Sequence, residues 1–495
     1  MIDAAKPARG PAFAILERPP VWGGIAVLVM ALQAWLVAGH EPFVDEWQAV
    51  QIAVQSPGWS QLLENLGYEG HPPLWHLLLR GLAEVLGPYN ALPAATLLLG
   101  FATLWLILFE SPFPRWARLL VALSEFVLFE YNTVSRSYTL GVMLTFAVVA
   151  WWDRRRLVWL LIAALPFTDF LFGVISLGFV YLRWRERAIW WPGAGLWIVI
   201  SLVSAWIVLP APDFVSVYAP STRDMGSVLI WLARVSSVFL PLQGANFLYW
   251  DAPLPDALSL TMWTGFFAVA WLQTEGRGDM RLIVFGFLAV TLAFSVALNP
   301  LANRHVMLAG ILLIALTWRM LDEGGAMRRL FAIWLGIVAV AGLFTAAVNL
   351  VHPFDTAKEA ARRIHALGLA DEHWAAYPQQ HGQGIAAMTG IRFQRMEDDC
   401  MQDMIRWNQA RPYRTIQEME RGAVAEASEH GRYYILTDAP MASSPMIREL
   451  AFIERGYDGK TYRLFEIGPG LPRYARKLPP CAPGMTRFAD TPMLP

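Results

Sequence analysis

The sequence predicts an all-α polytopic membrane protein of about eleven transmembrane helices, followed by a small α/β domain at the C-terminus. Hydrophobic residues make up 56% of the 495 residues and charged residues only 16%, which is more apolar surface than a soluble core of this length requires. Apolar runs recur up to about residue 350, and the composition turns polar from about residue 352. We therefore expect a transmembrane region at 21–350 and a separate domain at 351–495.

Eleven apolar runs define the expected spans. They lie at 21–38, 91–109, 116–129, 138–152, 157–165, 170–181, 189–209, 257–272, 282–298, 306–318 and 330–348. Several are shorter than the roughly 20 residues that a perpendicular span needs. The alternative to eleven separate spans is that two of these runs are paired or re-entrant segments. We interpret 225–241 as an interfacial or re-entrant helix, because counting it as a span would invert the charge bias of every later loop.

Basic residues indicate how the chain is oriented. With residues 1–20 in the cytoplasm, the arginine-rich loops also fall there, as the positive-inside rule requires. These loops contain Arg115, Arg118, Arg154, Arg155, Arg156, Arg183, Arg185, Arg187, Arg277, Arg281, Arg328 and Arg329. The same orientation places the long loop 39–90 and the whole C-terminal domain outside, and the arginine- and tryptophan-rich loops favour a bacterial inner membrane.

Charge and cysteine content exclude some functions. The net charge of −1 provides no basic field that would attract nucleic acid. Cys400 and Cys481 both lie in the polar C-terminal part without a CxxC motif, and their spacing leaves one disulfide or two free thiols as alternatives. Within this domain we expect a helix at 356–367, a strand at 433–437 and a poorly ordered proline-rich tail.

The loop 39–90 contains the first candidates for catalysis. Asp45 and Glu46 precede an amphipathic stretch, and a second such stretch lies near 74–85, so both can hold the acidic pair close to the membrane surface. A carboxylate in that position suits a general base for a hydroxyl acceptor. The alternative is an acidic pair that merely begins a helix, where carboxylates meet the positive end of the helix dipole.

Other polar residues on the same predicted face are candidates for binding. Glu69 and His71 lie in the long loop, although the two prolines after His71 have a simpler role in positioning the next helix. Asp169 is a second acid, a metal ligand or a polar contact to substrate, with a helix N-cap as the alternative. Glu125 and Glu130 are candidates for the same roles as Asp169. Glu125 lies deeper in the membrane, where an ionised carboxylate needs a partner.

Two positively charged positions occur where the positive-inside rule discourages them. Arg136 with Tyr138, and Arg304 with His305, lie at the external ends of apolar helices. A lipid phosphate explains them, because a guanidinium offers fork-shaped donors to phosphate oxygens. Snorkelling of the arginines to lipid headgroups is the alternative explanation.

These motifs together resemble the GT-C polytopic glycosyltransferases. The motifs are the Asp45–Glu46 pair, the EGHPPLW segment at 69–75, the SRSYTL segment at 135–140 and the NRH segment at 303–305. Over about 20–350 the chain is similar to the branch of dolichyl-phosphate-mannose protein mannosyltransferase-like and aminoarabinose transferase-like enzymes. Each motif is weak alone, and their order and common membrane face carry the resemblance.

The resemblance implies a polyprenyl-phosphate sugar donor, an acceptor hydroxyl on the non-cytoplasmic side, and inversion at the anomeric carbon. It implies that Asp45 is the catalytic carboxylate, that Glu46 supports it, and that Arg304, assisted by Arg136, neutralises the donor phosphate. Two positions depart from the pattern, since many relatives have tyrosine where this chain has His305 and histidine where it has Asp169. No cofactor is implied with certainty; some relatives use a divalent metal, and no compact ligand set here requires one.

Two other functions remain alternatives. A transporter or flippase of lipid-linked saccharides also uses intramembrane acids, but such proteins commonly show internal repeats and midplane charges. A polysaccharide polymerase or ligase would share the donor chemistry. The acceptor is expected to be a saccharide, a lipid or a protein.

Overall fold

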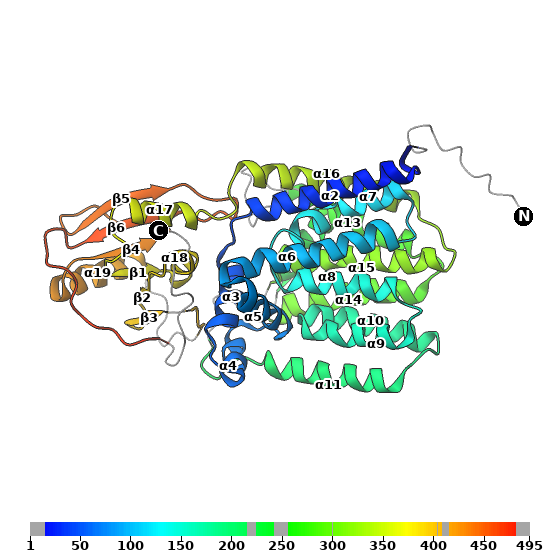
Figure 1. Ribbon diagram of the computed structural model, residues 1–495, viewed down its shortest axis with the longest axis horizontal. Helices are drawn as coiled ribbons and strands as arrows, with labels where there is room; N and C mark the ends of the chain where they lie inside the picture. Colours follow the sequence, from blue (N-terminus) through cyan, green and yellow to red (C-terminus); the bar gives the residue numbers. More distant parts are fainter. Residues whose placement is uncertain are drawn as a thin grey trace, which may run out of the picture.

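The computed structural model describes residues 15–214, 224–241, 256–298, 300–402, 404–407 and 415–481, the side chains of 256–260 excepted. A bundle of long helices forms one part, and a sheet with flanking helices lies at one end of it (Figure 1). Most of the expected cytoplasmic N-terminus, part of the loop 210–226 and the last part of the proline-rich tail, 482–495, lie outside the described residues.

All eleven predicted apolar runs are helical. The helices of this part are α2 (Pro19–Gly39), α6 (Pro88–Trp105) with its π-helical extension η1 (Leu106–Glu110), α7 (Arg115–Ala122), η2 (Phe126–Glu130), α8 (Ser137–Ala150), α9 (Arg155–Ala164), η3 (Leu165–Phe167), α10 (Phe170–Arg185), α11 (Trp191–Ile207), α12 (Met225–Phe239), α13 (Asp256–Gln273), α14 (Gly278–Ala297), α15 (Asn303–Asp322) and α16 (Arg329–Val351). In the described part of the chain, five helices are long and apolar enough to cross a membrane: α2, α6 with η1, α14, α15 and α16.

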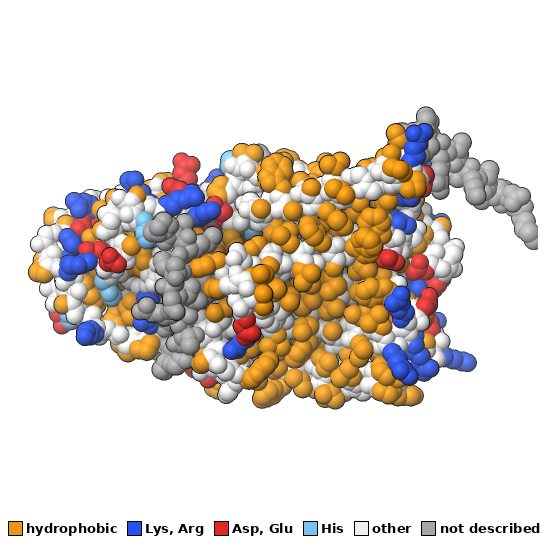
Figure 2. All heavy atoms as spheres, viewed as in Figure 1, with side chains coloured by type: hydrophobic (Ala, Val, Ile, Leu, Met, Phe, Trp, Pro, Cys, Tyr) orange, Lys and Arg blue, Asp and Glu red, His pale blue; other side chains and the backbone are white. Residues whose placement is uncertain are grey.

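Apolar side chains cover the face of this bundle that Figure 2 shows. Leu28 on α2 is 70% exposed, Trp191 on α11 76% and Val340 on α16 68%. Soluble proteins rarely expose contiguous apolar surface of this kind, whereas lipid tails solvate it. The surface therefore agrees with an integral membrane protein.

Helix α12 packs among the other helices. Trp231 on α12 donates to Thr291 Oγ1 on α14 at 3.0 Å, and Trp334 on α16 donates to the carbonyl of Val238 on α12 at 3.0 Å. Gly310 lets α15 approach η2 closely, since a Cβ at this position would lie 2.8 Å from the Phe126 ring. These contacts join α12 to the helix bundle, and its assignment as an interfacial or re-entrant segment stays a prediction.

The loop 39–90 is helical rather than irregular. It forms α3 (Val44–Gln55), α4 (Trp59–Glu69) and α5 (Leu74–Leu86). The two amphipathic stretches correspond to α3 and α5, which pack on each other. Helix α4 was not expected from the pattern; it ends at Gly70, whose left-handed φ of 81° turns the chain toward α5.

The C-terminal region is an α/β domain, as predicted. It contains α17 (Ala357–Ala366), β1 (Trp374–Tyr377), η4 (Gln379–His381), α18 (Gly382–Thr389), β2 (Phe393–Arg395), β3 (Cys400–Gln402), α19 (Ile416–His430), β4 (Tyr433–Thr437), β5 (Ile447–Ile453) and β6 (Tyr462–Ile467). The strand order is β3-β2-β1-β4-β6-β5. Strand β1 runs parallel to β2 and β4, and the other pairs are antiparallel.

Both faces of the central strands are buried, which explains their continuous apolar sequence. Trp374 and Leu436 share a core with residues of α17 and α18. Their neighbours Ala375 and Ile435 belong to a second core that includes residues of α19. Because side chains alternate along a strand, the helices cover opposite faces of the sheet.

Side-chain and backbone contacts attach the domain to the first loop. The Gln48 amide on α3 donates to the Ile405 carbonyl at 2.7 Å and accepts from the Ile405 N–H at 3.0 Å. Phe43, Phe129, Phe354 and Tyr457 form a buried aromatic cluster across the same junction. The domain and the end of the bundle therefore share packed surface.

Cys400 and Cys481 form a disulfide with a Cα–Cα distance of 5.0 Å, which decides between the two alternatives left by their spacing. The double substitution Cys400→Ser with Cys481→Ser should destabilise the C-terminal domain by about 2–5 kcal/mol, because the bridge closes a long loop. Hydrogen exchange of the β3 amides in the full-length protein measures this loss. Equal exchange in the variant and the native protein would contradict it.

Candidate functional site

Glu46 joins the start of α3 to the segment before α8. Its side chain is fully buried, and Oε2 accepts from the Phe43 N–H at 3.0 Å and lies 2.9 Å from His40 Nε2. Oε1 accepts from the Ser135 N–H at 2.6 Å. Glu46 therefore caps α3 locally, as the simpler explanation of the acidic pair required, and also fixes α3 against residues far away in the chain.

This link brings together the residue before Glu46 and the residue after Ser135. Asp45 forms an ion pair with the Arg136 guanidinium, and the Asp45 side chain remains 36% exposed. Burial acts to raise the pKa of Asp45, but nearby positive charges outweigh it and leave the pKa below its ordinary value. These charges belong to Arg136, Arg304 and Lys460. Asp45 is therefore an ionised, accessible carboxylate at neutral pH.

The start of α15 adds a second guanidinium. Arg304 is 8% exposed, and its guanidinium lies 5.6 Å from the centre of the Phe43 ring, over which Arg136 lies at 5.9 Å. Tyr131 Oη donates to the Arg304 carbonyl at 2.5 Å. The two predicted arginines thus converge on one aromatic ring beside Asp45.

His305 and Tyr138 complete this side of the site. His305 Nδ1 accepts from the Ala302 N–H at 3.0 Å, so this ring caps its own helix. Its ring meets that of Tyr138 edge-on, with 5.8 Å between centroids, and Tyr138 stacks on Tyr131 at 6.0 Å. These contacts orient the first turns of α8 and α15 toward each other.

A row of alternating acids and histidines leads away from the arginines. His71 Nε2 lies 3.7 Å from Asp169 Oδ2, and His71 Nδ1 lies 3.6 Å from Glu69 Oε1. Glu69 Oε2 lies 2.7 Å from His76 Nε2. Burial would raise the pKa of Glu69, but the charges of His76 and His71 outweigh it and lower the pKa to about 2.

Asp169 also performs the simpler role considered for it. Its Oδ1 accepts from the Leu171 N–H at 2.9 Å and caps α10, while Oδ2 faces His71. All nine candidate residues thus lie at the end of the bundle that meets the C-terminal domain. Among the residues that the structure describes, no three His, Cys, Asp or Glu side chains are placed to hold a metal ion.

Lys460 is a component of the site that the sequence did not suggest. It lies between β5 and β6, with Nζ 3.3 Å from Asp355 Oδ2 and 3.8 Å from Asp458 Oδ2, and its charge acts on Asp45. The loop is held close to the bundle at Gly456, where a Cβ would lie 2.4 Å from the Phe354 carbonyl oxygen. No local motif marks Lys460, because only the docking of the domain brings it to Asp45.

The assembled groups can bind an anion and accept a proton. One guanidinium pairs with an ionised carboxylate at the end of an apolar bundle, and the charges of Arg304 and Lys460 also act on it; such a set suits a phosphate next to a hydroxyl that loses a proton. In comparisons with known proteins, no family model and no curated protein matches the chain. The chemistry of the site therefore carries the functional argument.

Replacing Glu46 should unfold the junction. Glu46→Ala leaves His40 and the Ser135 N–H buried without their carboxylate, which should cost about 3–5 kcal/mol. Thermal unfolding in detergent measures this, with Glu64→Ala on the exposed side of α4 as the control, where the Arg406 pair contributes about 0–1 kcal/mol. Equal stability of the two variants would mean that Glu46 does not hold α3 in place.

Proposed function

We propose that the chain is a membrane glycosyltransferase that moves a sugar from a polyprenyl-phosphate donor to an acceptor hydroxyl. The observation that carries this proposal is the position of the Asp45 carboxylate beside Arg136 and Arg304, at the end of an apolar bundle. A polyprenyl chain can lie in lipid along the bundle while its phosphate reaches the guanidinium groups. The position of these charges at one end of the bundle supports an enzyme over a transporter with charges along a midplane pathway.

The proposed reaction is a displacement at the anomeric carbon. Asp45 accepts the proton of the acceptor hydroxyl as its oxygen bonds to that carbon. The bond from carbon to the phosphate oxygen breaks on the opposite face, and the lipid phosphate leaves with the electron pair, so the configuration inverts. Arg304 and Arg136 stabilise the charge that grows on the phosphate.

We further propose that the site and the C-terminal domain face the outside of a bacterial inner membrane, with about eleven spans. Lys and Arg side chains are abundant at the end of the bundle away from the domain, near the N-terminus (Figure 2). That distribution supports a cytoplasmic location for this end under the positive-inside rule. Five helices satisfy the length of a span, so the remaining spans would be short, with the bilayer thinned locally or flanking residues snorkelling to its surface.

Asp45→Asn should keep the fold and lower kcat about 10²–10⁴-fold, because an amide cannot accept the proton. The assay is sugar transfer from synthetic polyprenyl-phosphate sugars by the purified protein in detergent. Glu64→Gln, on the same loop, serves as the matched control and should retain activity. Transfer by Asp45→Asn at the native rate would remove Asp45 from the mechanism.

Arg304→Ala should raise the KM for the donor about 10–100-fold, as expected when a charged hydrogen bond to phosphate is lost. Arg304→Lys should recover only part of the lost donor affinity, since an ammonium keeps the charge but lacks the paired planar donors of a guanidinium. Steady-state kinetics at saturating acceptor give both values. A donor KM that stays at the native value in Arg304→Ala would place the phosphate elsewhere.

Removal of Lys460 should change the pH dependence of transfer. Asp45 must be ionised to act, and its pKa is lowered, so native activity should persist in acid until the pH falls below the ordinary aspartate pKa of 3.8. Lys460→Met removes one of the lowering charges, so the Asp45 pKa rises and activity is lost at a higher pH. The pH profile of kcat/KM tests this, with Lys477→Met on the exposed tail as control; superimposable profiles would contradict the role of Lys460.

A further inference from the structure

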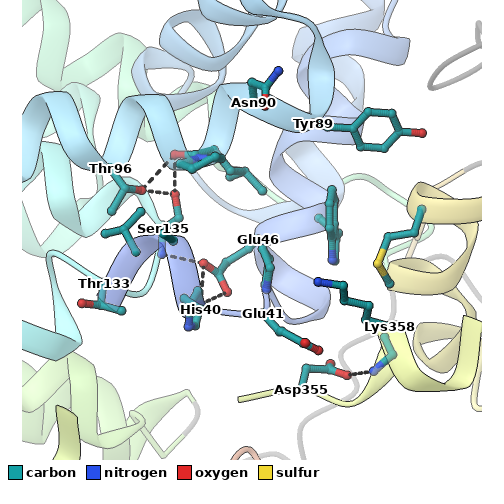
Figure 3. Close-up of a pocket in the computed structure, with 18 residues that line it drawn as sticks. His40, Glu41, Glu46, Tyr89, Asn90, Thr96, Thr133, Ser135, Asp355 and Lys358 are labelled. Atoms are coloured by element: carbon teal, nitrogen blue, oxygen red, sulfur yellow. Dashed lines mark hydrogen bonds and ion pairs between the residues drawn. The ribbon is translucent and has the colours of Figure 1, made fainter. Parts of the chain in front are cut away.

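A pocket of about 240 Å³ lies beside the Asp45 site, where α2, α3 and α6 meet the C-terminal domain (Figure 3). Glu46 and His40 line it, whereas Asp45 does not. Apolar residues at the ends of α2 and α6 form part of the wall, and Lys358 of α17 approaches from the domain. The pocket is therefore distinct from the cation-rich side of α3.

The charges around this pocket differ from those around Asp45. Glu41, Glu46 and Asp355 contribute carboxylates, and Lys358 is the one lysine or arginine among the lining residues. The guanidinium groups of the site lie over Phe43, whose ring contacts that of Phe354, which in turn contacts His40. A lining with more carboxylates than cations disfavours a phosphate and suits an uncharged or cationic ligand.

The polar groups at the base of the pocket are built into the fold. His40 has a side chain 3% exposed, and its Nδ1 is buried with no hydrogen-bond partner among the described residues, while Nε2 faces Glu46. Thr96 and Ser135 share a hydroxyl contact at the same level. Tyr89 adds an aromatic wall near the mouth (Figure 3). The His40 Nδ1 atom and the partly buried Glu41 carboxylate, next to an aromatic ring, are suited to bind a ligand rich in hydroxyl groups.

We propose that this pocket binds the sugar of an acceptor, an uncharged or cationic saccharide group without phosphate. Its role as an acceptor site rests on the proposed glycosyltransferase function, but the binding of a saccharide does not depend on turnover. Asp355 connects the two sides, because it lines the pocket and also pairs with Lys460 near Asp45. A sugar bound there would place the reacting hydroxyl of the acceptor so that it extends past Asp355 to Asp45, where the donor phosphate lies.

The experiment measures protection of a cysteine at the mouth of the pocket. Both native cysteines are paired, so Asn90→Cys provides a single reactive thiol in the full-length protein. The rate of maleimide labelling is measured in detergent with methyl glycosides of glucose, mannose, N-acetylglucosamine and glucosamine, and separately with polyprenyl phosphate. Ala38→Cys, at a second exposed lining position, repeats the test if Asn90→Cys folds poorly. Val85→Cys, 79% exposed and outside the pocket, is the control.

At least one glycoside, at about ten times its Kd, should slow labelling of the pocket cysteine about tenfold and leave the control unchanged. Polyprenyl phosphate should not protect. Protection by no glycoside, or by polyprenyl phosphate alone, would overturn the proposal. Protection in a protein that transfers no sugar would remove the glycosyltransferase function and keep the saccharide pocket, whereas transfer without protection would remove the pocket alone.

Discussion

The buried carboxylate of Glu46 is the contact on which the geometry of the site depends. It receives the Phe43 and Ser135 N–H groups and contacts His40, so the beginning of α3 cannot move independently of the segment before α8. Because Asp45 directly precedes Glu46 and Arg136 directly follows Ser135, their ion pair is a consequence of this link. A buried acid with a full set of donors thus positions a neighbouring acid that remains accessible for chemistry.

The C-terminal domain takes part in the site rather than only covering it. Gln48 hydrogen-bonds to the Ile405 backbone on one side of α3, and the loop between β5 and β6 brings Lys460 to Asp45 on the other. Burial acts to lower the pKa of Lys460, but the carboxylates of Asp355 and Asp458 outweigh this effect and raise the pKa. Lys460 therefore keeps its charge in this position. The domain therefore adds to the positive charge that holds Asp45 ionised.

Much of this architecture follows from local patterns, and the rest depends on distant contacts. Apolar runs predicted every long helix of the bundle, and the amphipathic stretches of the first loop predicted α3 and α5. The extent of burial of α3 could not be predicted, because residues 46–53 are all buried instead of one apolar face alone. The pairing of Cys400 with Cys481 and the place of Lys460 could not be predicted, because each depends on segments that meet only in the folded domain. The start of a helix at the acidic pair was one of the two explanations from sequence, but the contact of Glu46 with Ser135 could not be predicted, because these residues meet only in the folded chain.

The central claim is that the cations beside Asp45 hold a lipid phosphate with a sugar within reach of this carboxylate. The most direct measurement is a structure of the Asp45→Asn protein with a bound polyprenyl-phosphate sugar. We expect the phosphate within hydrogen-bond distance of Arg304 and Arg136, the anomeric carbon facing residue 45, and the polyprenyl chain along the apolar surface of the bundle. A phosphate bound away from both arginines, or a sugar that does not face residue 45, would contradict it.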